Sequence, residues 1–163
     1  SFTFAKESLQ DAIETVLPLV SRLADQRDIH IITDIPASLP SIHADRDRFS
    51  QILINIIDNA IKFTPAGGTV TIGAHGDYRG NAVITVTDTG IGIPRDEIPR
   101  LGERFYRVDK TRSRDLGGTG LGLSIVKHLM RAHGGEFTVE STPGRGTTVS
   151  LCFPACPDDS NPA

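Results

Sequence analysis

The sequence predicts an α+β fold, a two-layer α/β sandwich in which a mixed sheet of about five strands packs against three helices. Segments with apolar residues at helical spacing alternate with short segments rich in β-branched residues. Clusters of glycine and proline separate most of these segments. At 163 residues, with 38% hydrophobic and 23% charged residues, the chain has the size and composition of one globular domain.

Three helices are expected at residues 8–27, 48–63 and 121–133, where apolar residues recur every three to four positions. A proline at Pro18 should kink the first of them. For the second, Asp45 offers an N-cap, and a Pro-Ala-Gly-Gly sequence ends the helix. A Gly-Gly pair follows the third helix and should end it in the same way.

Strands are expected where β-branched residues cluster between turn signals. These segments are residues 29–32, 41–44, 69–74, 82–88, 136–140 and 147–153. Turns at residues 76–80 and at Pro143-Gly144 would join the last four strands into two hairpins. We assign residues 1–154 to one domain and residues 155–163 to a flexible tail.

Charge and composition exclude several classes of partner. The net charge of −3 argues against a broad basic surface for nucleic acid or for an anionic membrane. No apolar stretch reaches the roughly 18 residues of a membrane-spanning helix, and no apolar leader is present, so we expect a cytoplasmic location. Cys152 and Cys156 lack a second pair to complete a zinc site; they could form a bridge or stay reduced.

A polar strip runs along the second predicted helix. Asn55, Asn59 and Lys62 fall within one narrow sector beside a broad apolar face. These groups could satisfy the nearby backbone or face solvent, because an unpaired buried polar group costs about 1–3 kcal/mol. Alternatively, two amide oxygens one turn apart suit a magnesium ion that also binds phosphate, and Lys62 would add a cation for phosphate oxygens.

An aspartate, Asp88, ends one of the predicted strands. If Ile84 and Val86 face the helices, the Asp88 carboxylate points between the layers, where it needs a hydrogen-bond donor. The exocyclic amine of adenine is such a donor. Gly90 and Gly92 follow, and their missing side chains would let a flat ring approach the backbone. A turn that caps the next helix is the structural alternative.

A basic stretch at residues 95–114 contains seven Lys or Arg residues. It could be a solvated loop or an anion-binding lid. In a lid, Tyr106 would stack near a base, and Arg107 and Lys110 would neutralise phosphates.

A glycine-rich sequence, Gly118-Thr119-Gly120-Leu121-Gly122, leads into the third predicted helix. Free N–H groups and the dipole at a helix N-terminus favour phosphate. The spacing matches neither a Rossmann fingerprint nor a Walker loop, so the sequence alone is weak evidence.

Four motifs in this order resemble the N, G1, F and G2 boxes of the ATP-binding catalytic domain of bacterial two-component sensor histidine kinases. They span residues 55–62, 88–94, 103–107 and 118–123. The resemblance covers residues 4–153 and implies the Bergerat-type ATP-binding fold, which gyrase-type, chaperone and mismatch-repair ATPases share.

The resemblance implies ATP and Mg²⁺ as cofactors and assigns roles to individual residues. Asn59 would be the magnesium ligand with Asn55 in support, Asp88 would select adenine, and Arg107 would bind phosphate. The residues expected to contact ATP are Asn55, Asn59, Lys62, Phe63, Asp88, Gly90, Gly92, Ile93, Tyr106, Arg107, Lys110, Gly118, Thr119, Gly120, Leu121, Gly122 and Thr147. Phe63 stands where the family usually has tyrosine. Residues 144–147 resemble a further glycine box, although a plain hairpin turn explains them nearly as well.

The implied activity is that of a protein-histidine kinase that donates the γ-phosphate to a histidine on a separate dimerisation domain of the same protein. A response regulator would then receive the phosphate. This domain is expected to contact neither nucleic acid nor membrane. It could still be the cytoplasmic part of a membrane-anchored sensor. None of the five histidines lies in an acceptor motif, and Asn55 replaces the glutamate that serves as base in gyrase-type relatives. A serine-phosphorylating anti-sigma kinase and a nucleotide-sensing pseudokinase are the alternatives.

Overall fold

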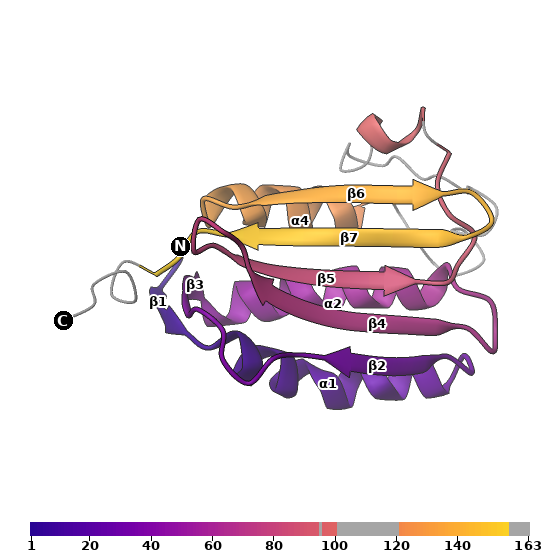
Figure 1. The fold of residues 1–163 in the computed structure, drawn as a ribbon, viewed down its shortest axis with the longest axis horizontal. Helices are drawn as coiled ribbons and strands as arrows, with labels where there is room; N and C mark the ends of the chain where they lie inside the picture. Colours follow the sequence, from indigo (N-terminus) through magenta and orange to yellow (C-terminus); the bar gives the residue numbers. More distant parts are fainter. Residues whose placement is uncertain (95, 101–120, 157–163) are drawn as a thin grey trace.

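The computed structural model describes residues 1–94, 96–100 and 121–156. A five-stranded sheet carries three helices on one face, and a two-stranded sheet lies at the end near the N-terminus (Figure 1). The predicted α+β sandwich is therefore confirmed. None of the helices in the described ranges is both long enough and apolar enough to span a membrane.

The elements follow the expected order with small shifts at their ends. They are β1 (Phe4–Glu7), α1 (Leu9–Asp25), β2 (His30–Asp34), β3 (Ile42–Asp45), α2 (Arg46–Lys62), β4 (Thr69–Gly76), β5 (Ala82–Asp88), the short 3-10 helix η1 (Ile98–Arg100), α4 (Leu121–Ala132), β6 (Glu136–Thr142) and β7 (Gly146–Phe153). α1 continues through Pro18 as one helix. β1 was not expected; it pairs with β3.

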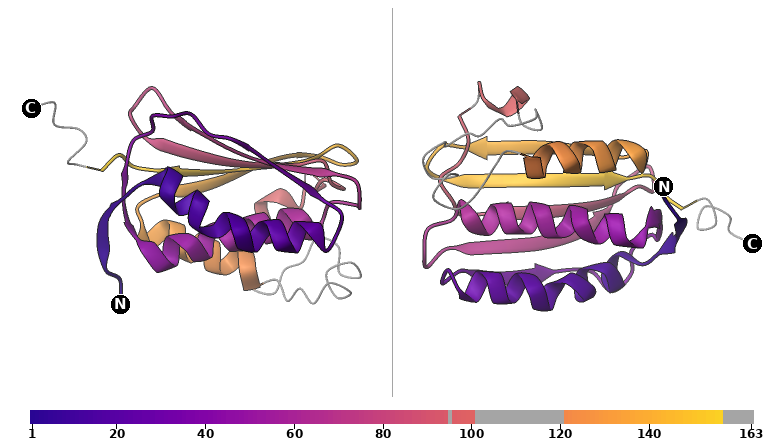
Figure 2. Two further views of the ribbon diagram at one scale, coloured as in Figure 1. Left: turned by 90° about the horizontal axis from the view of Figure 1, so that it is seen from below. Right: turned by 180° about the vertical axis from the view of Figure 1, so that it is seen from behind.

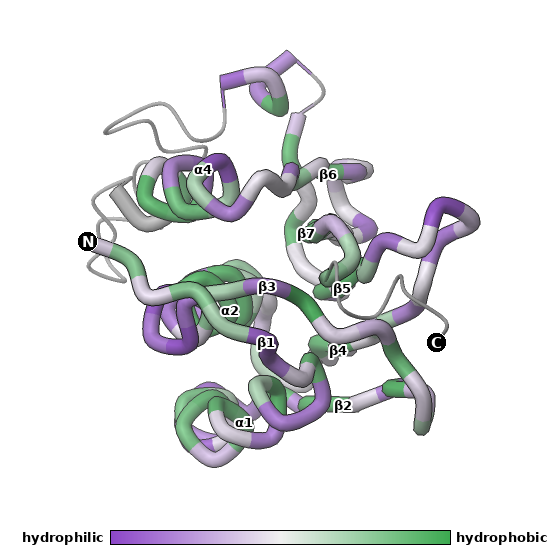
Figure 3. The backbone as a smooth tube through the Cα atoms, turned by 90° about the vertical axis from the view of Figure 1, so that its left-hand side faces the viewer, coloured by the Kyte–Doolittle hydropathy of each residue, from purple (hydrophilic) through white to green (hydrophobic). Residues whose placement is uncertain are grey.

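The main sheet has the strand order β2-β4-β5-β7-β6. It is mixed because β2 runs parallel to β4, while the other neighbours are antiparallel. Helix α2 lies in the middle of the helical layer and packs against both α1 and α4 (Figure 2). Seen end-on, the helices form one layer and the sheet the other (Figure 3).

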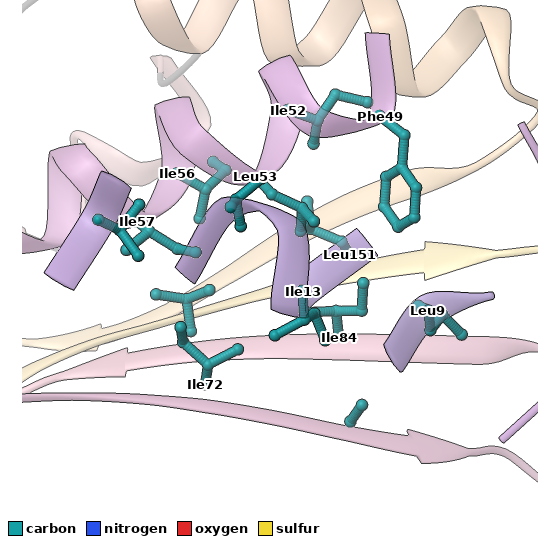
Figure 4. Packing of buried hydrophobic residues seen from close by; sticks show 14 of the residues in the cluster. Leu9, Ile13, Phe49, Ile52, Leu53, Ile56, Ile57, Ile72, Ile84 and Leu151 are labelled. Carbon is teal, nitrogen blue, oxygen red and sulfur yellow. The ribbon is translucent and has the colours of Figure 1, made fainter. Parts of the chain in front are cut away.

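The core fills the space between these two layers. Ile72, Ile84 and Leu151 point from the sheet toward α2, where Leu53 and Ile56 meet them (Figure 4). All five are at most 1% exposed. Burying each such side chain contributes about 1.5–3 kcal/mol, so this cluster fixes the position of α2 on the sheet.

Asp45 joins three segments at the end of the molecule near the N-terminus. Its Oδ1 accepts from the N–H of Arg48 at 3.0 Å, which confirms the predicted N-cap of α2. Its Oδ2 accepts from the N–H of Thr3 at 2.7 Å, and its own N–H donates to His133 Nε2 at 3.2 Å. The backbone hydrogen bonds from Thr3 and Arg48 hold the pKa of Asp45 below its ordinary value.

The first two residues of the expected tail are packed against β3. Ala155 forms an antiparallel bridge with Ile42, and the N–H of Cys156 donates to the Ser41 carbonyl at 3.1 Å. Cys152 and the buried Cys156 are both free thiols. Residues 157–163 lie outside the described residues, and the proposed domain boundary stays a prediction.

Candidate functional site

The C-terminal ends of α2 and β5 and the turn between β6 and β7 lie at the same end of the molecule, opposite the N-terminus (Figure 1). Ile84, Val86 and Asp88 are buried on the helix side of β5, whereas Thr85 and Thr87 lie on the other face. The sequence left open which face of β5 meets the helices. In the structure it is the face of Ile84 and Val86, so Asp88 points into the space between the layers.

Asp88 is 8% exposed, and its two carboxylate oxygens have different surroundings. Oδ1 accepts from the N–H of Gly90 at 2.8 Å and from the N–H of Thr147 at 3.2 Å. Burial raises the pKa of Asp88 above its ordinary value, although these two hydrogen bonds oppose the shift. No hydrogen bond from another described residue reaches Oδ2, which is therefore available to a ligand that carries an amine or ring N–H.

Gly90 brings the loop after Asp88 against the end of α2. A Cβ on Gly90 would overlap the carbonyl oxygen of Phe63, so only glycine allows this approach. The same Phe63 oxygen accepts from the N–H of Ile91 at 3.2 Å. The contribution of Phe63 in this structure is thus its backbone carbonyl, which connects the helix to the loop.

Gly92 brings the loop against the turn between β6 and β7. Its φ of +76° suits glycine, and a Cβ there would overlap the Thr142 carbonyl. The Ile91 carbonyl accepts from the N–H of Gly144 at 2.7 Å. Gly144 therefore lies in the hairpin turn between β6 and β7, which also holds the loop after Asp88, and the resemblance of residues 144–147 to a glycine box stays a prediction.

Sequence reasoning missed Ser141, which lies on β6 directly opposite Thr147. Its Oγ accepts from the N–H of Ile93 at 2.7 Å and donates to the Gly146 carbonyl at 2.9 Å. Its Oγ is also 2.8 Å from Thr147 Oγ1. One signal was present: Ser141 shares the more buried face of β6 with Phe137 and Val139, and a polar residue there needs partners.

The polar strip of α2 is partly buried, as expected at the edge of the interior. In the described part of the chain, the side chains of Asn55 and Asn59 have no hydrogen-bond partner, and no fully buried side-chain oxygen or nitrogen is unpaired. Both amides are thus accessible to a ligand. Lys62 Nζ lies 3.1 Å from Asp58 Oδ2, a partner that the sequence analysis did not consider.

Several predicted contacts cannot be compared with the structure. Six of these residues lie outside the described ranges: Tyr106, Arg107, Lys110, Gly118, Thr119 and Gly120. Leu121 and Gly122 form the start of α4, and their predicted contacts with ATP stay predictions. The described residues therefore supply the Asp88 side of the site and the α2 strip.

Comparisons with known proteins show the family of the chain. Residues 44–157 match the family described as histidine kinase-, DNA gyrase B- and HSP90-like ATPase. The chain is 41% identical over 133 residues to sensor histidine kinase WalK of Bacillus subtilis, covering 81% of this chain and 22% of WalK. It is 38% identical over 144 residues to adaptive-response sensory kinase SasA of Synechococcus elongatus, covering 84% of this chain and 37% of SasA.

Two solved structures extend the comparison to the fold. The catalytic domain of histidine kinase ThkA superposes with a TM-score of 0.82 at 26% identity, covering 97% of this chain and 99% of that domain. Full-length ShkA in complex with AMPPNP gives a TM-score of 0.81 at 33% identity, covering 96% of this chain and 32% of ShkA. The chain spans well under half the length of WalK, SasA and full-length ShkA.

Proposed function

The chain belongs to the histidine kinase-, DNA gyrase B- and HSP90-like ATPase family, and on this basis we propose that it is the catalytic module of a sensor histidine kinase that binds Mg-ATP. Its γ-phosphate would pass to a histidine on a separate dimerisation domain of the same protein, and then to a response regulator. WalK and SasA are much longer than this chain, which leaves room in such kinases for further domains.

The observation that carries the proposal is the environment of Asp88. Asp88 is buried, its Oδ1 accepts from two backbone N–H groups, and none of the described residues donates a hydrogen bond to its Oδ2. The exocyclic amine of adenine is a suitable donor, whereas guanine presents a carbonyl oxygen at the equivalent ring position. We therefore expect ATP to be preferred over GTP, by about tenfold or more for one hydrogen bond to a charged group.

The α2 strip fits the phosphate end of the nucleotide. Magnesium bound to phosphates typically keeps several waters and takes only one or two protein oxygens, and Asn59 and Asn55 can supply these. The bound ion would neutralise charge on the β- and γ-phosphates. Lys62 would add a positive charge at the same end of α2, and Arg107, Lys110 and the glycines at 118–122 would complete phosphate binding.

Catalysis in this proposal depends on position and charge neutralisation, not on a covalent intermediate in this chain. His133 is an unsuitable phosphate acceptor because it is buried, its Nδ1 donates to the Leu129 carbonyl at 2.7 Å, and its Nε2 accepts from Asp45. In this proposal the acceptor histidine lies on the neighbouring domain.

Calorimetric titration of ATP, with and without Mg²⁺, tests the binding step. The wild-type chain should bind ATP in a magnesium-dependent way, and Asp88→Asn should weaken binding by about tenfold to a hundredfold through the loss of a charge-assisted hydrogen bond. Asp34→Asn, the same change at the exposed end of β2, is the control and should bind normally. A folded wild-type chain without ATP binding would contradict the proposal.

Transfer is tested with a separately produced histidine-bearing dimerisation domain and labelled ATP. Acid-labile, base-stable label on that domain is expected, because phosphohistidine hydrolyses in acid. Label that survives acid on a protein serine would favour a serine kinase of the same fold. ATP binding without any transfer would favour a nucleotide-sensing module.

A further inference from the structure

The hydroxyl of Ser141 uses its full hydrogen-bonding capacity at the base of the candidate site. It contacts Ile93 N–H at 2.7 Å, the Gly146 carbonyl at 2.9 Å and Thr147 Oγ1 at 2.8 Å. A serine hydroxyl has one proton to donate and two lone pairs that accept. The three contacts therefore use the one proton and both lone pairs of the Ser141 hydroxyl.

The chemistry of two partners decides the direction of the third hydrogen bond. A backbone N–H can only donate, so Ser141 accepts from Ile93. A carbonyl can only accept, so the single Ser141 proton goes to Gly146. Thr147 must then donate its own hydroxyl proton to the remaining lone pair of Ser141. The Thr147 hydroxyl, with its proton used, offers only lone pairs to any other group.

Thr147 stands next to Asp88 on the neighbouring strand. The two residues are register partners and are 9% and 8% exposed, and the Thr147 N–H donates to Asp88 Oδ1 at 3.2 Å. A ligand at this position therefore meets two acceptors, Thr147 Oγ1 and Asp88 Oδ2. Such a pair favours an amino group and disfavours a carbonyl oxygen.

We propose that Ser141 is a specificity-determining positioning residue, which fixes Thr147 as an acceptor and so selects a purine with an amino group at C6. This inference rests on the proposed function, because it concerns the same nucleotide. Ser141 itself acts through Thr147 and Ile93 and does not contact the base. Without the Ser141 oxygen, the Thr147 hydroxyl is free to turn and donate to a C6 carbonyl.

Inosine triphosphate is the appropriate probe, because it differs from ATP by a carbonyl at C6 and a proton on N1. In Ser141→Ala, Thr147 could donate to that carbonyl while Asp88 accepts from the N1 proton. We expect ATP to bind no more tightly than to wild type, because Thr147 can still accept from the C6 amine. Inosine triphosphate should gain about tenfold in affinity from the new hydrogen bond, so the preference for ATP falls by about tenfold.

Two control variants separate this role from a general loosening of the site. Ser141→Thr keeps the hydroxyl and should keep the wild-type ratio of ATP to inosine triphosphate affinity. Thr148→Ala removes the neighbouring hydroxyl, which pairs with Thr87 at 3.1 Å on the opposite face, and should also keep the ratio. Ser141→Cys, in which sulfur is a weak donor and acceptor, replaces the alanine variant if that variant does not fold, with the same expected loss of preference.

The outcomes are distinct. If Ser141 only held the loop at Ile93 in place, its loss would weaken the affinity for both nucleotides equally. An unchanged ratio of the two affinities in Ser141→Ala or Ser141→Cys therefore overturns the inference. Wild-type chain that binds neither nucleotide contradicts the proposed function and this inference with it. Wild-type binding with an unchanged ratio in the variants contradicts the inference alone.

Discussion

The carbonyl oxygen of Phe63 accepts a hydrogen bond from the N–H of Ile91 at 3.2 Å, and this bond joins the end of α2 to the loop after Asp88. Phe63 directly follows Lys62, the last residue of α2. The helix that carries the polar strip therefore ends against the loop after Asp88, which would contact the base. The loop after Asp88 and the polar strip of α2, which would hold the two ends of the proposed nucleotide, are therefore parts of one packed unit. A change at this contact should affect both ends together.

Gly92→Ala should disturb this unit strongly. Its φ of +76° is strained for alanine, and the added Cβ would overlap the Thr142 carbonyl. The left-handed conformation alone costs about 1–2 kcal/mol, and the overlap adds to it. Gly80→Ala is the matched control, since Gly80 has a φ of +83° and nothing within 4 Å of its added Cβ.

Urea unfolding measures this difference. Gly80→Ala should lose about 1–2 kcal/mol, and Gly92→Ala should lose clearly more and also bind ATP more weakly. Equal losses of stability in the two variants would show that the contact with the β6–β7 turn is unimportant.

Asp88→Asn should change the pH dependence of stability. Because the folded-state pKa of Asp88 lies above its ordinary value of 3.8, the folded protein holds this proton more tightly than the unfolded chain. The burial cost of Asp88 is therefore absent below pH 3.8, grows as the pH rises through the folded-state pKa, and is fully present above it.

The asparagine variant lacks this titration. At neutral pH it should be at least as stable as wild type, and the difference should shrink as the pH falls below the folded-state pKa. Urea unfolding at several pH values measures this difference in stability, with Asp34→Asn as the exposed control. A wild-type chain more stable than Asp88→Asn at neutral pH would argue that the hydrogen bonds to Oδ1 outweigh burial.

Lys62→Met should reduce ATP affinity with little effect on stability. The pair between Lys62 and Asp58 joins side chains that are 29% and 28% exposed, and an i,i+4 pair of this kind contributes about 0.2–0.5 kcal/mol. Loss of a charged contact to phosphate should weaken ATP binding by about tenfold in dilute salt and by less in concentrated salt.

Asp58→Asn gives the opposite expectation, because it releases Lys62 from a competing carboxylate and should tighten ATP binding. Lys127→Met on the exposed face of α4 is the control and should leave binding unchanged. Tighter binding of ATP to Lys62→Met would exclude a phosphate contact by this lysine.

Local patterns in the sequence predicted most of the fold, because helices and strands follow from periodicity over a few residues. β1 escaped prediction since its residues are mostly exposed and its partner β3 is distant in sequence. Asp88 was identified from its place at a strand end, yet only packing decided which face it occupies. The position of Ser141 on the more buried face of β6 signalled that it needs partners, but the partners themselves could not be predicted, because its bond to Ile93 spans 48 residues.

His133→Phe should destabilise the junction at Asp45. Because His133 Nε2 accepts from the Asp45 N–H at 3.2 Å, its Nδ1 must carry the proton that is donated to the Leu129 carbonyl at 2.7 Å. Phenylalanine preserves an aromatic ring near Phe4 and Phe153 but leaves the Asp45 N–H without its acceptor. The expected loss is about 1–3 kcal/mol in urea unfolding, the cost of an unpaired buried polar group.

His43→Phe is the matched control, because His43 is exposed and stacks on Phe4 with ring centroids 5.6 Å apart. This change keeps the stacking and should alter stability by no more than about 0.5 kcal/mol. His133→Gln, which can still accept a hydrogen bond, should be less destabilising than His133→Phe if the bond matters more than the ring. The reverse order of the two His133 variants would assign the stability to aromatic packing instead of the hydrogen bond to Asp45.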